Sequence, residues 1–223
     1  MAGCGASEQE LFDHGVESLE KAEFSKAIGY FDRVIEKNEL NTSAHNAKGV
    51  ALFQQGKFDE AVVAFTGSIN IDSTSYKPFF NRGNAYLEKK AYKEAVRDYN
   101  FANGLDPQQT DIYYNRGLAL LALEEYEDAV MDFDLALQVN PNQALVQFNK
   151  AKAQLGNNDP LGGMESLVNA INLDGENGAA YYLLGVTQLS ALGQKEDGCA
   201  NLKMALSLGY EDAKTWVDDF CQD

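Results

Sequence analysis

Few residues in this chain are of a type and spacing that could carry catalysis or hold a metal. The two histidines, His14 and His45, have no cysteine or second histidine at the spacing of a zinc site. Asp132 and Asp134 stand two residues apart, which on a helix directs them to different faces and makes a poor acid–base pair. The adjacent pair Asp13–His14 is more typical of a solvated surface than of a catalytic dyad. We therefore expect no metal and no catalytic residues.

The short motifs that mark common enzyme folds are also absent. The sequence contains no G-x-S-x-G, no G-x-x-x-x-G-K-[ST] and no G-x-G-x-x-G. These motifs build the nucleophile elbow of hydrolases, the phosphate loop of nucleotide-binding enzymes and the dinucleotide-binding turn. The sequence therefore predicts a protein that is not an enzyme and that needs no cofactor.

Charge narrows the classes of partner. The 223 residues include 34 acidic and 18 basic side chains, for a net charge of −16. Phosphate contacts need clustered Lys and Arg, so binding to nucleic acid is not expected, and neither is adsorption to anionic lipid. Acidic residues gather between positions 124 and 134; they are Glu124, Glu125, Glu127, Asp128, Asp132 and Asp134. We interpret this cluster as a solvated face, with a docking patch for basic partners as the alternative.

The elements that must position any site follow from an internal repeat. Hydrophobic residues make up 45% of the chain, enough for a folded core, and no apolar stretch is long enough to span a membrane. Small and aromatic residues recur every 34 residues. The columns are Gly15, Gly49, Gly83, Gly117, Ala151, Gly185; Ala27, Ala61, Ala95, Ala129, Gly163; Phe24, Phe58, Tyr92, Tyr126; and Phe31, Phe65, Tyr99, Phe133, Leu167.

Each 34-residue unit reads as two helices that pack against each other. In the unit that starts at residue 76, apolar residues recur at helical spacing in two runs, separated by a break at 89–91. Pro107 ends the second run because proline cannot continue a helix. The small residues stand where two helices must approach closely, and the aromatic rings fill the space beside them. Since one helical hairpin cannot bury both its faces, each unit must stack on the next.

These columns resemble the tetratricopeptide repeat (TPR), a 34-residue helix-turn-helix unit. The glycine column, the alanine column, the closing Pro107 and Pro141, and the tripeptide Asn-Arg-Gly at 81–83 and 115–117 carry the resemblance. It implies an all-α fold: a right-handed α-solenoid of about six helical hairpins plus a capping helix, about 13 helices in all. The expected repeats are 8–41, 42–75, 76–109, 110–143, 144–177 and 178–211.

Some units depart from the family pattern. The fifth has Pro160 and Gly163 in place of the aromatic residue and the alanine, and its Gly162–Gly163 pair weakens the helix by roughly 1 kcal/mol per glycine. The sixth fits only with one extra residue before its second helix. A last helix, about 211–221, reads as the cap that a solenoid needs, so we expect a single domain over 8–223 with the cap at 211–223.

The amino-terminal residues suggest a lipid anchor. Residues 1–7 read as a tether, in which Ala2-Gly3-Cys4 is similar to the end of a bacterial lipoprotein signal, where the cysteine becomes lipidated. The apolar segment that precedes such a cysteine is missing, so Met1 stands where that leader would end. We expect Cys4 to carry lipid and to be the chain's only route to a membrane. The alternative is a free cytosolic amino terminus.

The two remaining cysteines suggest an exported protein. Cys199 precedes the expected turn at Gly209 by ten residues and Cys221 follows it by twelve, so an antiparallel hairpin places both at the same level. A Cys199–Cys221 disulfide and one lipidated cysteine fit an oxidising compartment. Two buried free thiols are the alternative.

A stripe of residues three before each first-helix glycine is the candidate partner-binding groove, since in TPR proteins this column lines the concave face. This column consists of Phe12, Asn46, Phe80, Tyr114, Phe148 and Tyr182. Asn84, Leu118 and Lys152 lie four residues further along on the same helix face, and with Lys77 they complete the predicted groove. The alternative is that the rings pack between repeats. Carboxylate-clamp repeats hold the acidic tails of chaperones with Lys and Asn in their first two units. Phe12, Val16, Asn46 and Val50 stand at those positions here, so binding of such tails is not expected.

The resemblance therefore implies a non-enzymatic scaffold or adaptor that binds a protein or an extended peptide. We expect a partner that is basic or neutral rather than acidic, because the chain is strongly acidic. The leading hypothesis is a lipid-anchored protein of a Gram-negative envelope, facing the periplasm or attached to the outer membrane. The alternatives are a cytosolic TPR scaffold and, from another class, an enzyme accessory subunit with unrecognised chemistry.

Overall fold

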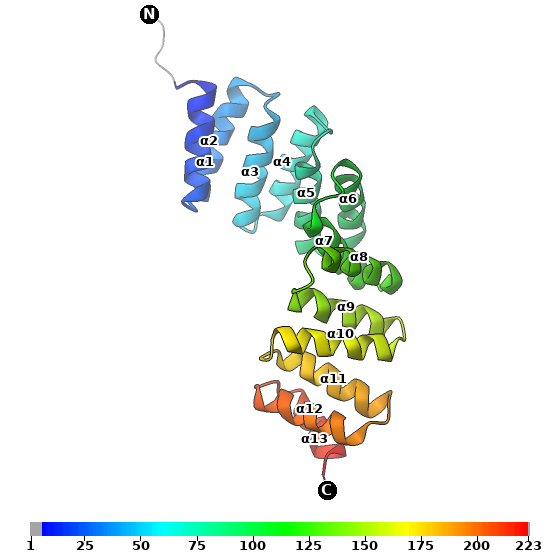
Figure 1. Ribbon diagram of the computed structural model, residues 1–223. Helices are drawn as coiled ribbons and strands as arrows, with labels where there is room; N and C mark the ends of the chain where they lie inside the picture. Colours follow the sequence, from blue (N-terminus) through cyan, green and yellow to red (C-terminus); the bar gives the residue numbers. More distant parts are fainter. Residues whose placement is uncertain (1–5, 223) are drawn as a thin grey trace, which may run out of the picture. The chain divides into compact units, whose positions relative to one another are not determined.

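A computed structural model describes residues 6–222, in which thirteen α-helices and no strand occur (Figure 1). The helices are α1 (Glu8–Glu20), α2 (Phe24–Lys37), α3 (Thr42–Gln54), α4 (Phe58–Ile71), α5 (Tyr76–Glu88), α6 (Tyr92–Leu105), α7 (Thr110–Ala122), α8 (Tyr126–Val139), α9 (Ala144–Gly156), α10 (Pro160–Leu173), α11 (Gly178–Ser190), α12 (Lys195–Ser207) and α13 (Ala213–Phe220). The predicted all-α fold is confirmed.

The helix boundaries follow the 34-residue period. The odd-numbered helices α1 to α11 begin at residues 8, 42, 76, 110, 144 and 178, the first residues of the six units. The second helix of the last unit, α12, begins at Lys195, one residue later than the period requires, as the predicted insertion demands. The capping helix α13 is shorter than expected, because residues 211–212 form a turn. None of the described helices is long and apolar enough to cross a bilayer.

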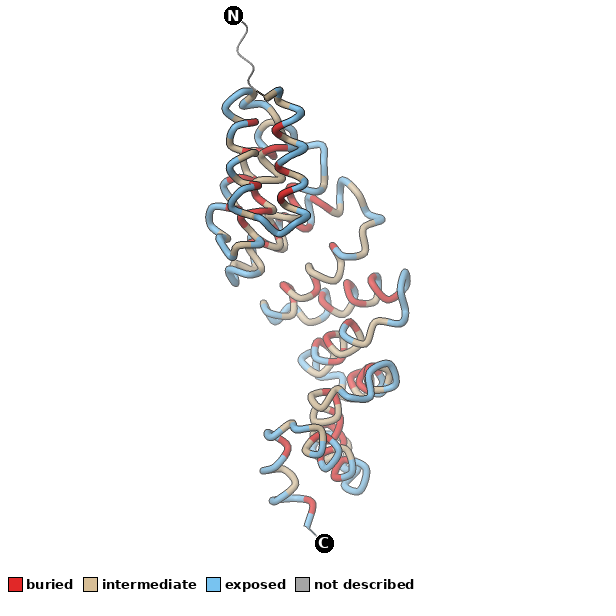
Figure 2. The backbone as a smooth tube through the Cα atoms, turned by 90° about the vertical axis from the view of Figure 1, so that its left-hand side faces the viewer, coloured by how far each residue is buried: buried red, intermediate tan, exposed pale blue. Residues whose placement is uncertain are grey.

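The chain divides into two compact units, one up to Ile112 and the other from Tyr113. In the first, α1 packs on α2, α2 on α3, and so on to α6. The second shows the same succession from α8 to α13. Buried positions recur along the helices of each unit, and exposed positions lie at the turns and outer faces (Figure 2). The expected single domain stays a prediction.

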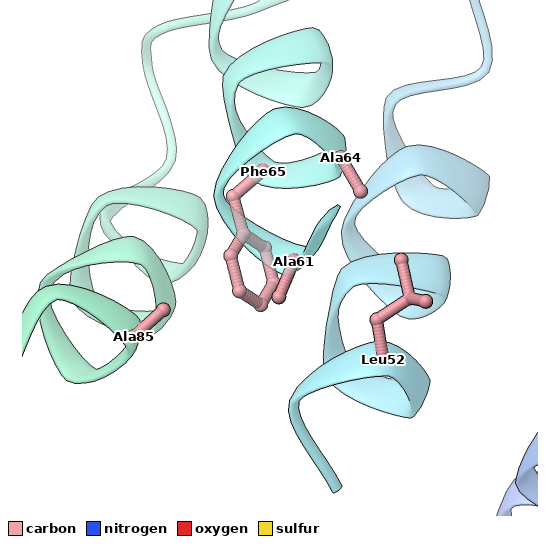
Figure 3. Packing of buried hydrophobic residues seen from close by; sticks show 5 residues of the cluster. All are labelled: Leu52, Ala61, Ala64, Phe65 and Ala85. Atoms are coloured by element: carbon pink, nitrogen blue, oxygen red, sulfur yellow. The ribbon is translucent and has the colours of Figure 1, made fainter. Parts of the chain in front are cut away.

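The glycine column exists because an aromatic ring occupies the place of a side chain. A Cβ atom built on Gly49 would lie 2.5 Å from Cε1 of Phe65, closer than any real contact. Gly15, Gly83 and Gly117 meet Phe31, Tyr99 and Phe133 in the same way. Figure 3 shows the ring of Phe65 on α4, with Ala85 of α5 on one side and Leu52 of α3 on the other. The predicted close approach of the paired helices is therefore confirmed at these four positions.

A left-handed residue turns the chain between the two helices of each repeat. Ala22, Lys90, Glu124 and Asn158 have φ between 57° and 62°, and Gly56 has φ of 72°. These five positions are spaced by 34 residues. In the sixth repeat the corresponding residue is Gly193, with φ of 68°, one position late because of the insertion. Four repeats thus place a non-glycine residue in a conformation that glycine adopts without steric cost.

In the fifth repeat, Gly162 and Gly163 of α10 each have a specific structural role. Asp159 caps α10 by accepting a hydrogen bond from the backbone N–H of Gly162 at 2.9 Å, and Pro160 occupies the first turn, where proline is tolerated. A Cβ atom on Gly163 would lie 2.6 Å from Cδ2 of Leu155. The Leu155 side chain therefore occupies the space that an alanine at position 163 would need.

Two buried ion pairs support the repeats that contain the Asn-Arg-Gly tripeptide. Arg82 donates two hydrogen bonds to Asp98, Nε to Oδ2 at 2.6 Å and Nη2 to Oδ1 at 2.8 Å. Arg116 binds Asp132 in the same way, at 2.7 and 2.6 Å. Sequence reasoning missed both pairs, although each Arg and each Asp recurs after 34 residues.

The ion pair of Arg116 corrects one interpretation from the sequence. Asp132 is only 3% exposed, so it does not belong to the solvated acidic face that we expected between residues 124 and 134. Burial raises the pKa of Asp132, and the bonds from Arg116 oppose that rise. Asp134 forms a separate, more exposed pair with Lys150 at 2.7 Å.

Candidate binding groove on the first helices

The predicted groove rings are each half-buried. Phe12, Phe80 and Tyr114 each lie against the core ring of the second helix of their own repeat, with centroid distances of 5.7, 6.1 and 6.1 Å. The core partners are Phe31, Tyr99 and Phe133 respectively. Each ring of the column therefore rests on the core by one side and keeps part of its surface accessible.

The first groove pocket, of about 400 Å³, opens between α1 and α3. It is lined by Glu8, Gln9, Phe12, Asn41 and Ser43. Oε1 of Glu8 accepts hydrogen bonds from the side-chain amides of Asn41 at 2.7 Å and Asn38 at 2.9 Å. These two bonds hold the pKa of Glu8 below its usual value, so the carboxylate at this pocket is ionised at neutral pH.

The second groove pocket, of about 240 Å³, is formed by α5 and by residues 109–112 around the start of α7. It is lined by Tyr76, Lys77, Phe80, Asn81, Gln109, Asp111 and Ile112. Phe80 and the buried Ile112 give it an apolar floor. Lys77 and Asp111 are exposed at its edge and carry opposite charges.

The two groove pockets occupy the same place in the first and third repeats. Gln9, Phe12 and Asn41 of the first pocket correspond to Lys77, Phe80 and Gln109 of the second, each 68 residues later. Both pockets thus place a half-buried phenylalanine beside two side-chain amides and one carboxylate, although the carboxylates Glu8 and Asp111 stand at different positions of the repeat. Sequence reasoning named Phe12, Lys77 and Phe80 but missed Glu8 and Asp111, which a search for carboxylates at the starts of the first helices would have found.

The two asparagines of the predicted groove in the first unit are hydrogen-bonded to other residues of the chain. The side-chain oxygen of Asn46 accepts a hydrogen bond from the amide of Asn81 at 3.0 Å. The side-chain oxygen of Asn84 accepts one from the hydroxyl of Tyr99 at 2.8 Å. Both asparagines therefore tie neighbouring helices together.

The groove residues of the second unit lie along α7, α9 and α11. The hydroxyl of Tyr114 accepts a hydrogen bond from Asn149 at 3.4 Å, and burial raises the pKa of this tyrosine. The exposed Lys152 places its Nζ atom 5.8 Å from the ring centre of Phe148. Tyr182 contacts Tyr210 at a centroid distance of 5.0 Å, and Leu118 is partly exposed.

The chemistry offered by these positions is that of recognition. Aromatic faces bury area at small entropic cost, and amide and carboxylate groups fix the register of a bound chain. No group of three or more His, Cys, Asp or Glu side chains within residues 6–222 is arranged to hold a metal ion.

The cysteines divide between the two ends of the chain. Cys199 of α12 is joined to Cys221, directly after α13, by a disulfide with Cα atoms 5.4 Å apart. Both residues lie in a buried cluster with Leu202, Ala205 and Ala213. The predicted lipidation site, Cys4, and the start of its tether lie outside the described residues.

Comparison with known protein families gives three matches. Models described as tetratricopeptide repeat match residues 12–69 and 110–143, and one described as TPR repeat matches residues 83–124. Together these matches cover more than half of the chain. No curated protein sequence matches the chain significantly.

Solved structures share the fold at low sequence identity. YrrB, described as a TPR protein with an unusual peptide-binding site, aligns with a TM-score of 0.73 and 21% identity over 80% of this chain and 91% of its own. A tetratricopeptide repeat protein from Parabacteroides merdae aligns with a TM-score of 0.67 and 22% identity over 98% and 100%. MamA from Desulfovibrio magneticus RS-1 aligns with a TM-score of 0.72 and 18% identity over 75% and 94%.

Proposed function

Because the chain belongs to the tetratricopeptide repeat family, whose members are scaffolds for protein–protein interaction, we propose that it is an adaptor that binds an extended segment of a partner protein. The segment lies along the first helices of the repeats, in the groove marked by Phe12 and Phe80. This family and fold are typically non-catalytic, and the proposed role is binding without chemistry.

The observation that carries this proposal is the equivalence of the two groove pockets. The two hollows lie two repeats apart and have a ring and a side-chain amide at equivalent positions, and each also has a carboxylate, at a position of its own. A partner chain that runs across the first helices would therefore meet similar groups twice. Aromatic residues in such hollows are the residue types that dominate binding energy at interfaces. YrrB, which shares the fold, is described as having a peptide-binding site, and this likeness is consistent with the same class of ligand.

The carboxylates favour a basic or neutral segment. Glu8 lines the first groove pocket and Asp111 the second, and the whole chain carries a charge of −16. A partner with Lys or Arg beside its apolar residues would be attracted, and an acidic partner would be repelled.

Site-specific cross-linking in the native host tests the groove. Benzoylphenylalanine placed at the exposed positions Gln9 or Lys77 should cross-link to one partner protein, through one short segment of it. The same residue at Leu161, which is 63% exposed on the second helix of the fifth repeat, is the control. Cross-links that form from Leu161 and not from Gln9 or Lys77 would contradict the proposal.

For location, we propose a lipid-anchored protein of a Gram-negative envelope. The triplet Ala2-Gly3-Cys4 supports a lipid attachment, and the pairing of Cys199 with Cys221 is consistent with an oxidising compartment. Labelling with radioactive palmitate in the native host should mark the protein, and Cys4→Ala should abolish the label. An unlabelled protein recovered from the cytosol with three free thiols would favour the alternative, a cytosolic scaffold.

A further inference from the structure

Besides the two groove pockets, the first unit has a further pocket on another face of the repeats. This pocket, of about 510 Å³, is built by α2, α3 and α4, and we call it the second-helix pocket. Its lining residues are Ile28, Asp32, His45, Lys48, Leu52, Glu60, Val63, Ala64 and Gly67. Ile28, Leu52, Val63 and Ala64 give it an apolar surface; Figure 3 shows Leu52 and Ala64 on neighbouring sides of α3 and α4.

This pocket is separate from the binding groove. On α3 the groove column passes through Asn46, whereas the second-helix pocket uses His45, Lys48 and Leu52. At about 100° per residue these three side chains point roughly 100° to 160° away from Asn46 around the helix axis. A ligand here would therefore not compete with one in the groove.

The hollow exists because the second repeat lacks a ring that the third repeat has. Gly67 corresponds to Phe101, and His45 corresponds to Phe79, each 34 residues earlier. In the third repeat these two phenylalanine rings are stacked, with centroids 5.4 Å apart. In the second repeat Val63, one helical turn before Gly67, lines the pocket and is 72% exposed. Gly67 also stands inside α4, where glycine costs about 1 kcal/mol relative to alanine.

The ring of His45 stands at the position that Phe79 has in the third repeat. Its Nε2 atom is 3.1 Å from the backbone oxygen of Glu39, a hydrogen bond that orients the imidazole. Its Nδ1 atom is 2.8 Å from the position that a Cβ atom would have on Gly67. The imidazole therefore overlaps the place where a side chain at position 67 would begin.

The rim of the second-helix pocket carries more negative than positive charge. Ala64 stands where the third repeat has Asp98, so Lys48, the counterpart of Arg82, pairs with Asp32 of the preceding repeat at 2.6 Å. Lys48 is the only Lys or Arg among the residues that line the pocket, so no second cation there offsets the exposed carboxylate of Glu60. The pocket is thus apolar inside, with a net negative edge.

We propose that the second-helix pocket binds an aromatic side chain of a partner protein, presented by a segment with basic residues beside it. The aromatic ring replaces the missing counterpart of Phe101, lies against His45, and contacts Leu52 and Val63. The neighbouring basic residues interact with Glu60 and Asp32. The scaffold thereby has a second binding face in addition to its groove.

Nuclear magnetic resonance offers a direct test, because the chain has two histidines and only His45 lines this pocket. The probe is the capped tripeptide Lys-Phe-Lys, added to the full chain. We expect the His45 Hε1 resonance to shift saturably while that of His14 does not. Lys-Ala-Lys, which lacks the ring, and Glu-Phe-Glu, with reversed charge, should each bind at least about fivefold more weakly.

Three variants separate this pocket from other sites. His45→Phe/Gly67→Phe copies the pair of the third repeat, so it should remove saturation transfer to the phenyl protons of Lys-Phe-Lys. Val63→Lys places a positive charge at the exposed mouth without disturbing the core, and it should weaken the His45 shift by about tenfold. Phe80→Ala, in the groove, should leave the shift unchanged. An unmoved His45 resonance, an equal response to Lys-Ala-Lys, or undiminished binding by Val63→Lys would overturn the proposal.

Discussion

Ion pairs at equivalent positions of the repeats differ in how deeply they are buried, and this difference separates structural polar groups from those that a partner can reach. The side chain of Asp98 is fully buried and held by two bonds from Arg82. Burial acts to lower the pKa of Arg82, but the bonds to Asp98 outweigh it and raise that pKa, so Arg82 carries its positive charge in the folded chain. Lys48 occupies the same column as Arg82 and forms an ion pair whose carboxylate is 43% exposed.

Removal of the two cations should therefore have different consequences. Arg82→Met leaves Asp98 buried without its partner and should lower the free energy of unfolding by about 3–5 kcal/mol. Lys48→Met, the matched control, breaks a half-exposed pair and should cost less than about 1 kcal/mol. Urea unfolding followed by circular dichroism measures both. Equal costs would show that burial of Asp98 does not govern the energy of the pair.

The carboxylates of the groove pockets should control the salt dependence of binding. Glu8→Gln/Asp111→Asn removes two charges from the pockets, so a basic partner peptide should bind about 3–10-fold more weakly at low salt. The difference should shrink as salt screens the remaining charge. Titration calorimetry at two salt concentrations measures the effect, with Glu127→Gln, outside the pockets, as the control. An unchanged affinity would contradict the predicted preference for basic segments.

At the scale of helices, the sequence predicted the elements well because the same steric contact, a glycine against an aromatic ring, recurs in successive repeats. The Gly–ring contacts fix where paired helices touch, and their 34-residue spacing places the helix starts. The left-handed turn residues Ala22, Lys90 and Glu124 could not be predicted from their types, whereas Gly56, Gly193 and Asn158 are of types that favour a positive φ. The ion pairs of Arg82 and Arg116 were missed because they join residues sixteen apart on different helices.

The left-handed turns give a test of stability at this scale. Lys90→Gly should raise the free energy of unfolding by about 0.5–1 kcal/mol, because glycine adopts φ of 58° without a Cβ clash. The converse change, Gly56→Ala, should lower it by about 1 kcal/mol for the same reason. Thermal unfolding of both variants shows whether the first is stabilised and the second destabilised. A destabilised Lys90→Gly would mean that the lysine side chain matters more than its backbone conformation.

The carboxyl-terminal cap should depend on its disulfide. The bridge joins residues 22 apart in sequence, and a loop of that length should stabilise the fold by about 3 kcal/mol on the chain-entropy model. Reduction should therefore speed amide hydrogen exchange in α13 and in the last turns of α12, and leave α1 to α4 unchanged. Thiol counting in denaturant on material from the native host should find the pair oxidised. Three free thiols would refute the bridge.

At the scale of the whole molecule, the sequence predicted a scaffold but could not locate its hollows. It named Phe12 and Phe80 because their column has an obvious period. It did not reveal that Glu8 and Asp111 join them, since a pocket depends on how neighbouring helices meet. The second-helix pocket could not be predicted from the repeat pattern, because it depends on a departure from that pattern: Gly67 stands where the third repeat has Phe101.

The central claim is that the groove rings bind a partner rather than hold the fold, and Phe80→Ala tests it most directly. Two quantities are measured on this variant: its free energy of unfolding and its affinity for the partner segment identified by cross-linking. Because Phe80 is half-buried against Tyr99, we predict a loss of about 1 kcal/mol in stability and of about 2 kcal/mol or more in binding. A loss of about 3–5 kcal/mol in stability with unchanged affinity would contradict the account.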